Sequence, residues 1–319
     1  MAYSFPMSKK ERKIQRQANL RRPSVKKNTP DSKPAFQGEL RKDLSKDSPN
    51  SPAPYVRHTG QNMRVPPHQR HNTKTPNSTA LWIFGKHPVL AALSNPKRIV
   101  KRLLVTKRGA DQYLDDFRHI NDNIRPLTPE IILPDVMEKI LPLDCVYQNI
   151  ALHTEALPEI SLESCCTIKP GEAHLVLLLD QLTDPHNVGA IIRSAAAFGA
   201  RAIISTDRNS PPESGTLAKA ASGALEILPW VRVTNLSHTL DSLAEMGYWR
   251  LGLDGTADLS ITQADFGKNI ALVMGAEGKG LRKGTQSHCD ALIKLPIKRA
   301  VESLNVSNAA AIALYAFSE

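Results

Sequence analysis

The chain has 319 residues and a formal net charge of +10, and its length is compatible with two domains of ordinary size. Residues 1–80 carry 17 Lys or Arg residues against 5 Asp or Glu residues, so the entire basic excess lies in this first quarter. No apolar run approaches about 18 residues, which excludes a transmembrane helix and a secretory signal, and a soluble, cytoplasmic protein is expected.

Residues 1–78 are predicted to form a disordered, basic N-terminal extension. They hold 10 of the 23 prolines and no sustained apolar periodicity, so they cannot bury enough apolar surface to offset the entropy lost on ordering. Because Lys and Arg side chains release condensed counterions when they bind phosphates, an RNA partner suits this segment. A solvated linker and a mitochondrial transit peptide are the alternatives.

A small α/β domain is predicted for residues 79–155. An apolar stretch before Gly85 is typical of a short strand, and the residues after it show helical periodicity. The chain is expected to become irregular over residues 151–171, and residues 156–172 are assigned to a linker. The other expected elements are a strand at 99–106 and helices at 111–121 and 135–141.

A parallel sheet covered by helices on both faces is predicted for residues 173–319. The continuous apolar run at 174–180 is typical of a buried parallel strand, and strand patterns then alternate with helical patterns. The expected strands cover 174–180, 201–205, 226–233, 248–254, 270–274 and 291–295, and the expected helices cover 188–198, 212–221, 237–246, 283–288 and 304–317.

The four cysteines indicate reduced thiols. They show neither C-x-x-C spacing nor a His at metal-ligand spacing, and two of them are adjacent, which disfavours a disulfide framework. The cysteines are Cys145, Cys165, Cys166 and Cys289.

The first polar loop of the larger domain follows the strand at 174–180. It runs through Asp184-Pro185-His186-Asn187 into the helix that carries Arg193. Asn187 is expected to cap that helix, and Arg193 follows six residues later, so helix geometry alone does not place both side chains on one face. Taken alone, Arg193 is also compatible with an ordinary solvated position.

The second loop, Gly275-Ala276-Glu277-Gly278-Lys279-Gly280, follows the strand at 270–274. Glycines at the carboxyl end of a strand allow a ligand to approach the backbone, and the ligand crevices of open α/β sheets lie at those ends. A flexible turn is the alternative. The glycine order is not G-x-G-x-x-G and no acidic residue follows about 20 positions later at a second strand end, which disfavours a Rossmann dinucleotide site.

The third loop contains Ser303-Leu304-Asn305-Val306-Ser307 and leads into the last helix. Its hydroxyl and amide side chains lie beside the unpaired backbone N–H groups of a helix N-terminus, which outlines a ligand site. An ordinary capped helix packed on the sheet is the alternative for this segment alone.

Together, and in this order, the three loops closely resemble the three motifs of the SpoU/TrmH family of RNA ribose 2′-O-methyltransferases, within the SPOUT superfamily. The resemblance covers Leu175–Phe317 throughout and, more faintly, Phe84–Leu152, which looks like the family's small substrate-binding domain. The chain departs from the family at Tyr147-Gln148-Asn149, where His-Gln-Gly is frequent, and at Arg299, where Gly is frequent. The first departure bears on which RNA is bound, and the second on the loop beside the cofactor.

The resemblance implies a trefoil-knotted α/β domain that binds S-adenosylmethionine in a bent conformation. It also implies a homodimer in which Arg193 reaches a site completed by the other subunit. Backbone groups at Gly275, Leu295 and Leu304 would hold the cofactor. No metal is expected, because the motifs contain no cluster of His, Cys and carboxylate side chains at metal-ligand spacing.

The implied reaction is an in-line attack of a ribose 2′-hydroxyl on a sulfonium methyl group, which requires alignment and removal of a proton. A guanidinium does not give up its proton in proteins, so Arg193 is expected to fix the target phosphate rather than to accept the proton. Glu277 is expected to orient Arg193 or the hydroxyl. The remaining hydrogen bonds are assigned to Asn187, Ser303 and Asn305.

A guanosine of large-subunit ribosomal RNA is the expected target, because the small N-terminal domain resembles that of ribosomal members of the family. A tRNA target and a catalytically inactive, RNA-binding ribosome assembly factor are the alternatives. The enzyme is favoured over the inactive factor because all four polar motif residues are present, namely Asn187, Arg193, Glu277 and Asn305.

Overall fold

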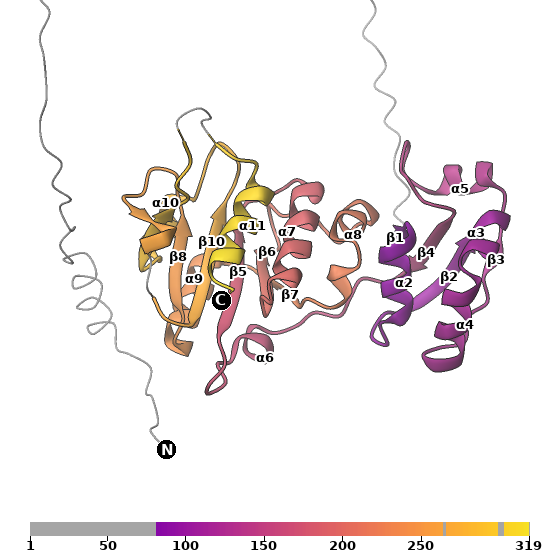
Figure 1. Cartoon of the computed structure of the whole chain (residues 1–319), viewed down its shortest axis with the longest axis horizontal. Helices are drawn as coiled ribbons and strands as arrows, with labels where there is room; N and C mark the ends of the chain where they lie inside the picture. Colours follow the sequence, from indigo (N-terminus) through magenta and orange to yellow (C-terminus); the bar gives the residue numbers. More distant parts are fainter. Residues whose placement is uncertain (1–80, 264–265, 299–302, 319) are drawn as a thin grey trace, which may run out of the picture. The chain divides into compact units, whose positions relative to one another are not determined.

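The fold is given by a computed structural model that describes residues 81–263, 266–298 and 303–318. The predicted basic extension and Arg299 lie outside the described residues. Two sheets are present in the described part, one of four strands and one of seven (Figure 1). None of the helices described is long and apolar enough to cross a membrane.

The four-stranded sheet is formed by residues 81–154, in the order β1-β4-β2-β3. Strand β4 pairs antiparallel with both β1 and β2, and β2 pairs parallel with β3. The strands are β1 (Leu81–Phe84), β2 (Val100–Val105), β3 (Glu130–Ile131) and β4 (Ile150–Thr154), and the helices are α2 (Lys86–Ser94), α3 (Lys107–Gln112), α4 (Leu114–Asn123) and α5 (Pro134–Ile140).

Two expectations for this region were wrong. The irregular stretch expected from residue 151 begins instead with β4, whose first three residues are fully buried between β1 and β2. The helix expected at 111–121 is two helices that meet at Tyr113, a buried residue whose hydroxyl donates to the Gln148 carbonyl at 2.7 Å. The linker at 156–172 also contains a short helix, α6 (Leu162–Cys166), which Ser161 caps.

The seven-stranded sheet has the order β7-β6-β5-β10-β8-β11-β9, and all of its strand pairs are parallel. This confirms the predicted parallel sheet. The strand expected at 226–233 starts only at Trp230, because residues 224–226 form a 3-10 helix. The strands are β5 (His174–Asp180), β6 (Ala202–Thr206), β7 (Trp230–Val233), β8 (Trp249–Leu253), β9 (Leu259–Ser260), β10 (Asn269–Gly275) and β11 (Ala291–Lys294).

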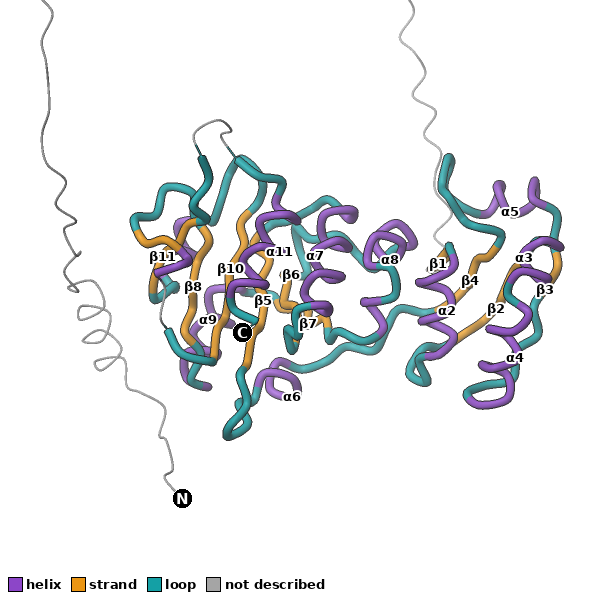
Figure 2. Tube along the Cα trace, in the orientation of Figure 1, coloured by secondary structure: helices purple, strands orange, loops and turns teal. Residues whose placement is uncertain are grey.

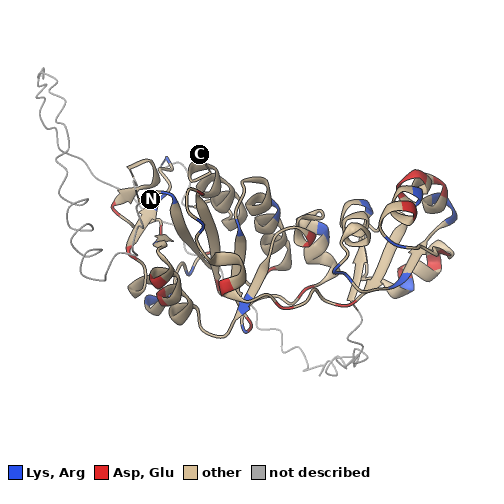
Figure 3. Ribbon diagram, turned by 90° about the horizontal axis from the view of Figure 1, so that it is seen from below, with Lys and Arg blue, Asp and Glu red and all other residues tan. Residues whose placement is uncertain are grey.

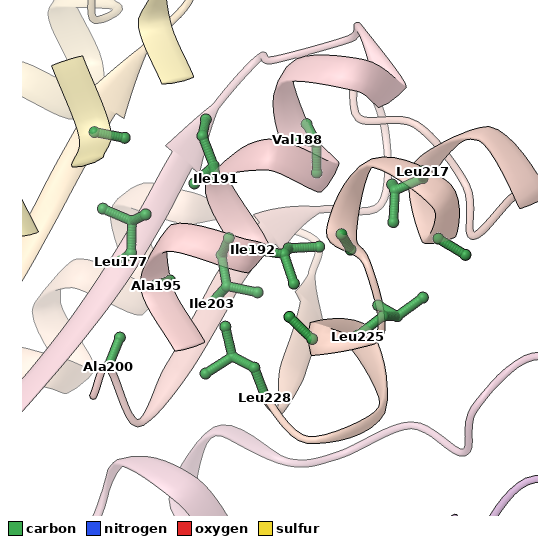
Figure 4. Close-up of a cluster of buried hydrophobic side chains, with 14 of the residues drawn as sticks. Leu177, Val188, Ile191, Ile192, Ala195, Ala200, Ile203, Leu217, Leu225 and Leu228 are labelled. Carbon is green, nitrogen blue, oxygen red and sulfur yellow. The ribbon is translucent and has the colours of Figure 1, made fainter. Parts of the chain in front are cut away.

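Helices cover both faces of the larger sheet, as predicted (Figure 2). Strand β5 is buried along its whole length, and its side chains alternate between two apolar clusters. Leu177 packs with α7 on one face, as Figure 4 shows, whereas Leu178 packs with α9 on the other. The helices are α7 (Pro185–Ala197), α8 (Gly215–Ala221), α9 (Leu236–Met246), α10 (Lys283–Ser287) and α11 (Val306–Ala316).

A buried histidine at the start of β5 predicts acid-sensitive stability. The His174 Nε2 atom accepts from the Lys169 N–H at 3.1 Å, so this nitrogen is unprotonated in the folded protein. Burial lowers the pKa of His174 below its ordinary value of 6.5, and the charge of Arg201 acts in the same direction. Below about pH 6.5 the unfolded chain therefore binds a proton that the folded protein binds only at lower pH.

We expect the free energy of unfolding to fall as the pH is lowered through this window, and to fall less steeply in His174→Gln. Chemical denaturation of both proteins at several values between about pH 5 and pH 8 measures the difference. Parallel pH profiles for the two proteins would contradict the assignment of this acid sensitivity to His174.

Candidate active site

The first polar loop leads from β5 into α7. This helix begins at Pro185, about one turn earlier than expected. Asp184 is the cap, because its carboxylate accepts from the His186 N–H at 3.0 Å, and Pro185 occupies the first helical turn. A proline suits this position since it has no N–H group to leave unpaired. Asn187 therefore lies within the first turn, and the expectation that it caps α7 is wrong.

Asn187 instead contacts the third loop. The Asn305 side-chain amide donates to the Asn187 Oδ1 atom at 3.0 Å, across 118 residues of sequence. The Oδ1 atom of Asn305 also accepts from the N–H of Ser307 at 2.9 Å, so Asn305 caps α11. The starts of α7 and α11 are thus joined by one side-chain pair, and the first and third loops meet.

The second loop folds back tightly on the end of β10. A Cβ atom on Gly275 would lie 2.2 Å from the carbonyl carbon of Gly280, so no other residue type fits without moving the backbone. The Gly280 N–H donates to the Ala276 carbonyl at 2.8 Å, and Gly278 and Gly280 have positive φ values of 76° and 64°. The loop's own backbone, rather than ligand access, explains the glycine at position 275.

An ion pair that the sequence patterns did not indicate fixes the residues that follow this loop to the end of β5. Asp180, the last residue of β5, is paired in register with Gly275, and its side chain is fully buried. Its carboxylate accepts from the Arg282 Nε atom at 2.7 Å and from the Arg282 backbone N–H at 3.1 Å. The sequence did contain one signal for this ion pair. Asp180 is a carboxylate at the end of an apolar run, and a buried charge requires a partner.

The remaining predicted site residues make fewer contacts. Arg193, Glu277 and Ser303 are exposed, and Leu304 is half-buried. Within the part of the chain that the structure describes, no hydrogen bond or ion pair joins Arg193 to Glu277. Leu295 packs against the apolar core, and its carbonyl accepts from the Ile297 N–H at 2.9 Å.

The described residues contain no group of three or more His, Cys, Asp or Glu side chains that could hold a metal ion. The predicted site residues offer amide, hydroxyl, guanidinium and carboxylate groups together with backbone donors and acceptors. Such groups can align and polarise two substrates, and the guanidinium can bind a phosphate.

Comparisons with known proteins identify the family to which this chain belongs. Residues 174–315 match the SpoU rRNA Methylase family. The 23S rRNA (guanosine-2'-O-)-methyltransferase RlmB of Vibrio cholerae is 46% identical over 238 residues, which cover 73% of this chain and 94% of that protein. The protein of the same name from Xanthomonas campestris pv. campestris is 43% identical over 241 residues, with the same shares covered.

A solved structure is also similar over most of the described chain. The SpoU methyltransferase AviRb from Streptomyces viridochromogenes, in complex with the cofactor AdoMet, has a TM-score of 0.62 and 25% identity. The match covers 75% of this chain and 89% of that chain. These findings confirm the resemblance carried by the three loops, and this chain belongs to the SpoU rRNA methylase family.

Proposed function

We propose that this protein is an S-adenosylmethionine-dependent methyltransferase that methylates a ribose 2′-hydroxyl, of a guanosine in large-subunit ribosomal RNA. The geometric observation that carries the proposal is the contact between Asn187 and Asn305, because it brings two of the three motif loops together where β5 gives way to α7. The relatives that match over 94% of their length are named for this reaction on 23S rRNA. AviRb supports the cofactor, since it was solved with AdoMet.

The proposed cofactor site lies at the carboxyl edge of the larger sheet. Gly275 ends β10 and Leu295 follows β11, and both strands pair parallel with β8, so their carboxyl ends share one edge. The residues fit the group, because the segments that follow β10 and β11 offer backbone N–H and carbonyl groups, and Gly275 adds no side chain there. Backbone groups of Gly275, Leu295 and Leu304 hold the cofactor, which supplies the methyl group when bound.

The proposed role of Arg193 is to bind the phosphate beside the target ribose. Its guanidinium is exposed and has no carboxylate partner among the described residues, so it is available to a second molecule. The positive charge of its guanidinium lowers the free energy of the developing alkoxide. Asn187, Asn305 and Ser303 align the hydroxyl, and Glu277 orients Arg193 or that hydroxyl.

Two copies form the active enzyme in this proposal, with Arg193 of one copy completing the site of the other. The outer face of α11 supports an interface, because Ile312 and Tyr315 on this helix are 47% and 58% exposed. A trefoil knot at the carboxyl edge is also proposed. The strand order supports it, since β10 lies between β5 and β8 and β11 lies between β8 and β9.

Residues 79–155 are proposed to bind the RNA substrate, residues 173–319 to carry out methyl transfer, and residues 156–172 to link them. The basic residues 1–78 are proposed to add salt-dependent RNA affinity without contributing to the reaction.

Methylation of an rRNA transcript by the purified full chain tests the function. We expect S-adenosylmethionine binding in a calorimeter, unchanged by a chelator, and a 2′-O-methylated guanosine at one position of 23S rRNA. Absence of cofactor binding would refute the enzyme and favour an inactive RNA-binding factor. Methylation of tRNA in place of rRNA would refute the assigned substrate and leave the chemistry intact.

A further inference from the structure

A polar cluster outside the three motif loops lies where α8 meets β1 and α2. The Gln148 Oε1 atom accepts from the Lys219 ammonium at 2.5 Å and from the backbone N–H of Lys86 at 3.1 Å. Two donors, one of them a full positive charge, thus converge on a single neutral oxygen. This arrangement matches what an anionic oxygen requires.

The chain holds the Gln148 loop in a strained conformation. Gln148 and Asn149 are consecutive non-glycine residues with φ values of 54° and 64°, in the left-handed region that such residues rarely adopt. Tyr113 fixes the loop through the Gln148 carbonyl, and the Thr106 hydroxyl donates to the Asn149 side chain at 3.0 Å. Strain that the surroundings maintain in this way is a feature of functional sites.

The position of the Lys219 ammonium is equally specific. A Cβ atom on Gly85, whose φ is 92°, would lie 2.3 Å from the Lys219 Nζ atom, so the ammonium rests against glycine backbone. On the other side of α8, a Cβ atom on Gly189 of α7 would lie 2.5 Å from the Leu217 carbonyl. This close packing of α8 on α7 fixes Lys219 relative to Asn187, which lies in the first turn of α7.

The charge of Lys219 is not balanced within the described part of the chain. No Asp or Glu pairs with it there, whereas Lys86 and Lys101 pair with Asp116 and Glu155. Burial lowers the pKa of Lys219, and burial raises the pKa of the neighbouring Cys145 thiol, so that thiol stays neutral and supplies no counter-charge. Figure 3 shows acidic and basic residues interspersed over the described chain, so the unbalanced charge is local.

We propose that Lys219, Gln148 and the Lys86 N–H bind a backbone phosphate of the substrate RNA. The phosphate oxygen replaces the Gln148 Oε1 atom between the two donors, and the exposed Gln148 carboxamide can rotate to donate its NH₂ group. The site orients the RNA and takes no part in methyl transfer. This inference rests on the proposed function for the identity of its ligand.

Lys219→Met tests the site, because methionine fills the same space without the charge. We expect the KM for an rRNA transcript to rise about tenfold and the slope of log affinity against log salt to flatten by about 1, the change that one phosphate contact predicts. Cofactor affinity and the thermal midpoint should stay unchanged, and Lys219→Arg should keep the salt slope. Lys268→Met, which removes the same charge from an exposed position directly before β10 and outside residues 79–155, is the matched control.

An unchanged salt slope in Lys219→Met, or a change equal to that of Lys268→Met, would overturn the site. Equal loss of RNA binding and of thermal stability would also overturn it, since Lys219 would then serve only packing. Failure of the wild-type protein to methylate rRNA is a different result: it refutes the proposed function, while the salt dependence of RNA binding still decides the role of Lys219.

Discussion

Arg193→Lys is expected to lower the rate of methyl transfer at least about a hundredfold, the loss typical of removing one electrostatic contact to a developing charge. Lysine keeps the charge but lacks the planar fork that binds two oxygens of one phosphate. Arg193 is exposed and unpaired among the described residues, so the substitution leaves the fold intact. Cofactor affinity and most RNA affinity should therefore be retained, and Arg193→Ala should be at least as inactive.

Single-turnover assays and calorimetry on the same preparations separate these effects. Arg108→Lys is the matched control, because Arg108 is another exposed helical arginine, on α3, and should behave as wild type. A wild-type kcat for Arg193→Lys would remove Arg193 from the mechanism.

Mixed dimers test whether Arg193 acts across subunits. Arg193→Ala subunits combined with Asn305→Ala subunits should regain a fraction of wild-type activity, since one site per heterodimer would hold both intact side chains. This holds if Asn305 serves the subunit that carries the cofactor, and its contact with Asn187 of the same chain supports that arrangement. Verified heterodimers without activity would place Arg193 and Asn305 in the same site.

Local patterns indicated six of the seven strands of the larger sheet, but they missed the two-residue strand β9 and did not explain all of the connections. The apolar run at 174–180 identified β5 to the residue, because a strand buried on both faces shows no polar alternation. The glycines after β10 marked a tight backbone, but their reason lies in the contact between Gly275 and Gly280, which spacing does not reveal.

Contacts between distant residues explain what the sequence patterns missed. The apolar triplet of β4 was too short to stand out, and pairing on both edges decides its conformation. Asp180 and Arg282 are 102 residues apart, and Gln148 and Lys219 are 71 apart, so only the folded chain brings each pair together. Asn187 was expected to cap its own helix, but its partner is Asn305 of the third loop.

Arg98→Met is expected to cause the largest loss of stability, about 3–5 kcal/mol, the range for breaking a buried ion pair from one side. The Arg98 side chain is fully buried and lies between two carboxylates, with Nη1 at 2.6 Å from Glu213 and Nη2 at 2.5 Å from Glu226. It also donates to the Glu155 carbonyl at 2.8 Å. The substitution would leave two carboxylates, 11% and 4% exposed, without a counter-charge.

The stability measurement is the shift of the thermal or denaturant midpoint of the full chain, and a surface pair between β2 and β3 provides the control. Arg102 contacts Glu130 at 2.7 Å, but both side chains are nearly half exposed, so Arg102→Met should shift the midpoint little. Adding Glu213→Gln and Glu226→Gln to Arg98→Met should recover part of the lost stability, because the unpaired charges are then removed. Equal midpoint shifts for Arg98→Met and Arg102→Met would show that the buried cluster does not stabilise the contact between α2, the 3-10 helix at 224–226 and the segment before α8.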